Sequence, residues 1–152
     1  MADPRKKSGK RSGGKGSTEK RPHKYLSTLY LDENLCDCAE ILAVLTEAGF
    51  TFRRHLEFFP RGTLDQDWLP LPGKNGWPVL TKDKALRFTP LEKAKILEHA
   101  LRIFAFSSGN LNGKDMATLL KANLRKLDSL VQKEPAPFVA SITKNGLHLR
   151  KL

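Results

Sequence analysis

The chain has 152 residues, with 27 Lys and Arg against 16 Asp and Glu, which gives a net charge of +11. This length suits one domain with a tail. No apolar run approaches the roughly 20 residues of a membrane-spanning helix. No apolar segment follows the basic N-terminus, as one would in a secretory signal. We therefore expect a cytoplasmic protein with no membrane partner.

The positive charge is concentrated in residues 1–24, which hold nine basic residues, two acidic ones and almost no apolar side chains. Such a segment cannot bury enough surface to offset the entropy lost on ordering. We expect a disordered basic tail over residues 1–24 and a folded domain over residues 25–152. The tail either binds nucleic acid through its phosphates without sequence preference, or only aids solubility or derives from cloning.

The first predicted elements are a strand, a helix and a second strand. Residues 25–31 are apolar enough for a buried strand. A helix is predicted from about Asn34, a suitable N-cap, to Ala48, with Gly49 as its C-terminal stop. A short strand follows over residues 50–54.

The middle of the chain contains many prolines and glycines, which favour loops. We expect a loop over residues 55–63, and then a short helix that begins near Asp65 and ends at the prolines that follow. A turn is predicted over residues 73–76. The next strand covers residues 77–81.

The second half of the chain again alternates helices and strands. A helix is predicted from a capping box at residues 89–92 to about residue 100, then a strand over 101–106, a helix over roughly 113–132, and strands over 138–143 and 147–149. The dipeptide Asn145-Gly146 between the last two strands is a strong signal for a hairpin.

This order of elements predicts an α/β fold of three layers. Strands that alternate with helices form a mostly parallel twisted sheet with right-handed crossovers and helices on both faces. The predicted C-terminal hairpin adds an antiparallel pair at the edge of the sheet.

Three acidic positions are the candidate functional residues. Asp32 and Asp83 each follow a predicted strand, and Asp65 opens the short helix that leads to the second of these strands. Ligands of open α/β sheets bind at the carboxyl ends of the strands. Carboxylates gathered there repel one another, and Mg²⁺ or Mn²⁺ would compensate them. A metal held in this way can promote hydrolysis of a phosphodiester.

Three segments around these acids resemble the PIN-like domains, a family of metal-dependent nucleases that is common among VapC-type toxins of bacterial toxin–antitoxin pairs. The sequence Leu-Asp-Glu-Asn-Leu at residues 31–35 is followed by a predicted helix and by Glu-Ala-Gly-Phe at 47–50. The other two segments are Asp-Gln-Asp-Trp at 65–68 and Trp-Pro-Val-Leu-Thr-Lys-Asp-Lys at 77–84. The resemblance covers about residues 25–150 and implies a PIN-like fold.

The resemblance also implies a function: a ribonuclease dependent on Mg²⁺ or Mn²⁺ that hydrolyses RNA, with Asp32, Asp65 and Asp83 as its acidic site. It further implies that the protein is the toxin of a pair, with RNA as substrate and a small antitoxin that blocks the site. Homodimers are common among such proteins, so a homodimer is a further expectation.

Other residues near these acids are secondary candidates. Glu33 and Asp67 could add metal ligands, although an acid in the first turn of a helix often only favours the helix dipole or caps the helix. The candidate RNA-binding residues are Lys82, Lys84, Arg53 and Arg54. Exposed cations of this kind are often only solvated. The four histidines show no ligand spacing, and we interpret them as structural or surface groups.

One departure from the family pattern favours an alternative. Many PIN-like domains carry a fourth acid near the end of the fourth strand, where this chain reads Phe-Ser-Ser-Gly-Asn at residues 106–110. The alternative is a degenerate, non-catalytic PIN-like module that binds nucleic acid or a protein partner. A phosphoacceptor domain of the receiver type is a weaker alternative, because the lysine that such domains need is not evident.

Overall fold

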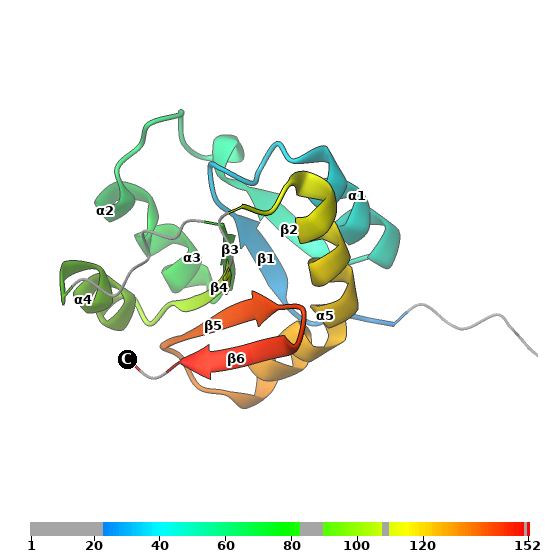
Figure 1. Ribbon diagram of the computed structural model, residues 1–152. Coiled ribbons are helices and arrows are strands. Elements are labelled where there is room, and N and C mark those ends of the chain that lie inside the picture. Colours follow the sequence, from blue (N-terminus) through cyan, green and yellow to red (C-terminus); the bar gives the residue numbers. More distant parts are fainter. Residues whose placement is uncertain (1–22, 83–89, 108–109, 151) are drawn as a thin grey trace, which may run out of the picture.

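The computed structural model describes residues 23–82, 90–107, 110–150 and 152 (Figure 1). Residues 1–22 lie outside this range, so the disordered tail stays a prediction. The elements are β1 (Thr28–Leu31), α1 (Ala39–Ala48), β2 (Thr51–Arg54), a 3₁₀ helix (His55–Glu57), α2 (Asp65–Trp68), α3 (Pro70–Asn75), β3 (Val79–Thr81), α4 (Pro90–Glu98), β4 (Arg102–Phe106), α5 (Gly113–Lys133), β5 (Phe138–Thr143) and β6 (Gly146–Arg150).

The six strands form one sheet in the order β2-β1-β3-β4-β5-β6. All neighbouring pairs are parallel except β5 and β6, which form an antiparallel hairpin at the edge. This arrangement confirms the predicted α/β fold with a C-terminal hairpin. In the parallel pair β1 and β3, Leu31 lies opposite Leu80. The next residue along each chain segment is Asp32 after Leu31 and Thr81 after Leu80, so these two residues come side by side.

Helices cover both faces of the sheet, which gives the predicted three layers (Figure 1). On one face, α1 and α5 bury apolar side chains such as Leu45 and Leu124 against the strands. On the other face, Leu69 and Ile96 pack in a smaller apolar cluster beside α2, α3 and α4. Among the described helices, none combines the length and the apolar character that crossing a bilayer requires.

The helix α1 begins at Ala39, five residues later than its predicted start at Asn34. The cause lies in Asp32, whose carbonyl oxygen and side-chain Oδ1 each accept the N–H of Leu35, at 3.1 Å in both cases. These bonds hold a turn directly after β1 and delay the helix. The predicted stop was correct, because Gly49 ends the helix in the left-handed conformation with a φ of 72°.

A second difference is the short helix α3, where a turn was expected. Pro70 and Pro72 lie in its first turn, where the backbone N–H groups have no helical partner and proline is tolerated. Gly73 allows α3 to pack closely, because an added Cβ there would lie 2.5 Å from the carbonyl oxygen of His99. Gly76 ends the helix with a φ of 69°.

Candidate active site

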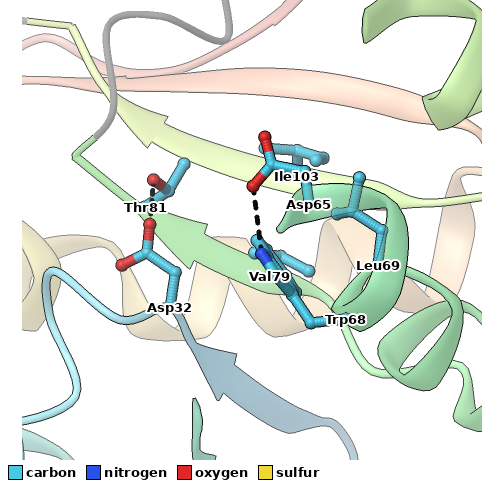
Figure 2. A pocket seen from close by; sticks show the side chains of 7 residues that line it. All are labelled: Asp32, Asp65, Trp68, Leu69, Val79, Thr81 and Ile103. Carbon is cyan, nitrogen blue, oxygen red and sulfur yellow. Dashed lines mark hydrogen bonds between the residues drawn. The ribbon is translucent and has the colours of Figure 1, made fainter. Parts of the chain in front are cut away.

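A small cleft lies on the face of the sheet that α2 covers and reaches the carboxyl ends of β1 and β3 (Figure 2). Its lining residues are Asp32, Asp65, Trp68, Leu69, Val79, Thr81 and Ile103. The structure therefore brings together two of the three acids predicted from the sequence: Asp32, which directly follows β1, and Asp65, the first residue of α2. This is the edge of the sheet at which α/β proteins bind ligands.

Asp32 is the buried acid of the cleft, with 6% of its surface exposed. Its Oδ1 accepts the N–H of Leu35 at 3.1 Å, and its Oδ2 accepts a hydrogen bond from the hydroxyl of Thr81. A buried carboxylate needs such donors to offset the loss of water. These two bonds hold the carboxylate at the carboxyl ends of β1 and β3.

Asp65 is the exposed acid of the cleft and the first residue of α2. Its Oδ1 accepts the indole N–H of Trp68 at 3.0 Å, as the dashed line in Figure 2 shows. The Trp68 ring is stacked on Tyr30, with a centroid distance of 5.5 Å and an angle of 12° between the planes. Asp65 is thus hydrogen-bonded to Trp68, which in turn packs on Tyr30.

Tyr30 also forms a buried pair with His55, which the sequence did not indicate. The hydroxyl of Tyr30 is 2.7 Å from Nδ1 of His55, and both residues are fully buried. Burial lowers the pKa of His55, although Glu33 and Asp65 oppose the shift. Burial, reinforced by the charge of Asp32, raises the pKa of Tyr30. Both side chains are therefore neutral near pH 7.

The two secondary acids lie outside the cleft lining. Oε1 of Glu33 accepts the N–H of Gly62 at 3.0 Å and lies 4.0 Å from Nε2 of His55. Asp67 is exposed on α2, and it is not among the lining residues. Of the two acids in Asp65-Gln66-Asp67, the structure therefore places Asp65 in the cleft. Metal binding by Glu33 and Asp67 stays a prediction.

Two candidate residues, Asp83 and Lys84, fall outside the described residues. The chain is described as far as Lys82, which is exposed and directly follows Thr81 at the end of β3. The third predicted acid therefore follows the cleft residue Thr81 by two positions in the sequence.

The two candidate arginines are engaged with other protein groups. Arg53 forms an ion pair with Glu57 at 2.8 Å, and its guanidinium lies 4.8 Å from the ring centroid of Phe58. Arg54 donates to the carbonyl oxygen of Cys36 at 2.7 Å and to Asp37. The hydrogen bond from Arg54 lowers the pKa of Asp37, and so does the bond from nearby Arg61. RNA binding by these arginines stays a prediction.

A family model described as a PIN-like domain matches residues 28–108, just over half of the chain. The chain belongs to the PIN-like domain family. The match runs from β1 to the end of β4 and includes every residue that lines the cleft. PIN-like domains are generally nucleases, which supports a hydrolase at that coarse level. A search of curated proteins found no match, and neither did a search of solved structures.

The chemistry of the cleft fits the divalent metals that PIN-domain nucleases typically use. Asp32, Asp65 and Thr81 present oxygen atoms, which suit hard cations such as Mg²⁺ and Mn²⁺ better than soft ones. Within residues 23–82, 90–107, 110–150 and 152, no group of three or more His, Cys, Asp or Glu side chains is placed to hold a metal. Asp83, the third predicted acid, lies outside that part of the chain.

Proposed function

We propose that this PIN-like protein is an endoribonuclease dependent on Mg²⁺ or Mn²⁺, with Asp32, Asp65 and Asp83 as metal ligands. The observation that carries the proposal is the meeting of Asp32 and Asp65 in one cleft, although they come from different elements. Carboxylate oxygens that two elements present to one cleft are the ligands that hard divalent cations prefer.

The protein's own groups prepare the two acids in different ways. Asp32 is buried and oriented by the N–H of Leu35 and the hydroxyl of Thr81, so it presents a fixed negative charge. Asp65 is solvent-exposed and offers its second carboxylate oxygen to a ligand. When bound, the cation neutralises charge that develops on the phosphodiester and makes water more acidic. No residue of the protein needs to form a covalent bond to the substrate.

Positive side chains near this edge of the domain support RNA as the substrate. Lys82 is exposed directly after the cleft residue Thr81, and Lys84 follows two positions later in the sequence. We propose that these lysines, with Arg53 and Arg54, contact RNA phosphates, which are bound largely by such charges.

The test is RNA cleavage by carboxylate variants in the presence of MnCl₂. Asp32→Asn and Asp83→Asn should each lower the cleavage rate by about 100-fold or more, because each removes a ligand charge while keeping the shape of the side chain. The control is Glu98→Gln, which removes an exposed carboxylate at the end of α4 and should cleave like the unaltered protein. Undiminished cleavage by both aspartate variants would remove the assignment.

Thermal unfolding with MnCl₂ or with EDTA separates the nuclease from its alternative. A cation that binds only the folded protein raises the melting temperature by mass action. The unaltered protein should gain stability from Mn²⁺, and Asp32→Asn should gain less. A protein that shows neither stabilisation nor cleavage would instead be the degenerate module that binds nucleic acid or a protein partner.

We further propose that this nuclease acts as the toxin of a toxin–antitoxin pair and that a small antitoxin covers the cleft. Its expression should then arrest growth, Asp83→Asn should relieve the arrest, and so should co-expression of the product of the neighbouring reading frame. Growth unaffected by the active protein would exclude a toxin. A homodimer in the cytoplasm stays our expectation for its working state.

A further inference from the structure

We infer that Trp68 is a positioning residue that holds the carboxylate of Asp65 in the cleft through its indole N–H. The inference rests on the proposed role of Asp65 as a metal ligand. It assigns to this aromatic residue a part in metal binding that its ring alone does not suggest.

The contact between the two side chains is direct. Nε1 of Trp68 lies 3.0 Å from Oδ1 of Asp65, three residues earlier on the same helical turn. The indole N–H can only donate, so it occupies one carboxylate oxygen and leaves Oδ2 for another ligand. Asp65 is exposed, and an exposed side chain without a tether exchanges rotamers freely. The hydrogen bond already restricts the rotamers of Asp65 before a cation binds. Less side-chain entropy is therefore lost when the cation binds.

The indole is itself held on two sides. Its ring is stacked nearly parallel to Tyr30, and it meets His55 edge-on with a centroid distance of 5.4 Å and an angle of 82°. Tyr30 is fixed in turn by its hydrogen bond of 2.7 Å to His55. Both of these residues are fully buried. Their packing therefore restricts the orientation of the Trp68 ring, and with it the direction of the indole N–H.

The chain offers a matched control in Trp77. This residue is stacked on the same Tyr30, at 6.4 Å and 15°. Its other ring contacts in the described part of the chain are with Phe58 at 5.9 Å and with the guanidinium of Arg53 at 5.5 Å. Trp77 does not line the cleft. A change of either tryptophan to phenylalanine keeps an aromatic ring against Tyr30, but only the change at Trp68 removes the donor to Asp65.

The experiment measures the affinity for MnCl₂ of Trp68→Phe and Trp77→Phe by calorimetry. Trp68→Phe should raise the Kd for Mn²⁺ about 10-fold or more, as is usual when a group that orients a metal ligand is lost, while Trp77→Phe leaves it unchanged. The double variant Asp65→Asn/Trp68→Phe should bind no more weakly than Asp65→Asn alone, because the tryptophan acts only through that carboxylate. A merely structural role would instead add its effect to that of Asp65→Asn.

A spectroscopic measurement covers the case in which Trp68→Phe fails to fold. In Trp77→Phe, Trp68 is the sole tryptophan, and its fluorescence should change when MnCl₂ binds beside it. When Asp65→Asn is added, the change should need a higher concentration of MnCl₂ to appear. Fluorescence that stays constant at saturating Mn²⁺ would overturn the inference.

The outcomes also separate this inference from the proposed function. If Asp65→Asn weakens Mn²⁺ binding but Trp68→Phe behaves like Trp77→Phe, the positioning role is wrong and the ligand assignment survives. If Asp65→Asn leaves the affinity unchanged, the ligand assignment of Asp65 itself is wrong.

Discussion

A single buried residue, His55, links the stability of the protein to pH. The imidazole is fully buried, and its Nδ1 bonds the hydroxyl of Tyr30. Within the described residues its Nε2 has no hydrogen-bond partner, although Glu33 lies 4.0 Å away. Burial outweighs the opposing charges of Glu33 and Asp65 and lowers the pKa of His55 below its usual value of 6.5. The folded protein therefore takes up a proton on this residue less readily than the unfolded chain.

The free energy of unfolding should fall as the pH drops below 6.5, the ordinary pKa of histidine. In that range the unfolded chain binds a proton at His55 and the folded protein does not, so stability is present above 6.5 and is lost below it. His55→Gln cannot titrate and should show a smaller fall between pH 7.5 and pH 5. Urea unfolding in EDTA at both pH values measures the difference. An equal fall in the two proteins would show that His55 is not the group responsible.

At the scale of elements, Asp128 connects α5 to the segment that leads into β1. The residue is 5% exposed, and its carboxylate accepts the N–H groups of Leu26 at 3.1 Å and Ser27 at 2.9 Å. Gln132, one turn later, donates to the hydroxyl of Ser27 at 3.2 Å. The segment that leads into β1 is thus tied to α5, the longest of the described helices.

Asp128→Ala should lower the free energy of unfolding by about 1.5–3 kcal/mol, because the backbone donors lose a charged acceptor while they remain partly buried. Urea unfolding at pH 7 measures the loss. Lys121→Ala, at an exposed position of α5, is the control and should change stability little. Equal stability of Asp128→Ala and the unaltered protein would mean that the segment is held by its apolar contacts alone.

The elements that sequence reasoning placed well are those set by local patterns. Gly49 ended a helix, Asn145-Gly146 formed a hairpin, and the alternation of strands and helices gave the parallel sheet. The predicted start of α1 was wrong because the carbonyl oxygen and Oδ1 of Asp32 accept the N–H of Leu35 and hold a turn there instead. The helix α3 was missed because Pro70 and Pro72 in the sequence predict the end of a helix. Proline ends a helix when it lies in the interior, but it is tolerated in the first turn, where these two residues lie.

The candidate site was predictable to a similar degree. Asp32 could be chosen because it follows a buried strand, and Asp65 because it precedes the next strand along the sheet. The stacking of both Trp68 and Trp77 on Tyr30 was not foreseen, since these rings come from separate segments that only the fold brings together. His55 carries no ligand spacing in the sequence, and its position behind the cleft follows from tertiary packing alone.

At the scale of the whole molecule, the excess of positive charge lies mostly in the N-terminal segment. Two acids meet in the cleft at the edge of the sheet. The segment 1–24 carries nine basic and two acidic residues, which account for most of the net charge of +11. If the cleft cuts RNA, these charges can attract phosphates without any contribution to the chemistry.

Deletion of residues 1–22 should therefore flatten the salt dependence of RNA binding. The deletion removes eight Lys and Arg and two Asp and Glu. For single-stranded RNA, the slope of log K against log salt should become shallower by about 0.7 for each phosphate that the tail neutralised. Binding is measured from low to high salt in the Asp83→Asn background, which prevents cleavage during the titration.

Charge and length can be separated with a full-length control in which the same eight Lys and Arg are changed to Gln. If the tail acts through phosphates, this control should show the same reduced slope as the deletion, because counterion release depends on charge rather than on chain length. A slope reduced only by the deletion would point to a different role for the segment. A slope unchanged in both would leave the RNA contacts to the domain itself, with Lys82, which directly follows the cleft residue Thr81, as the next position to alter.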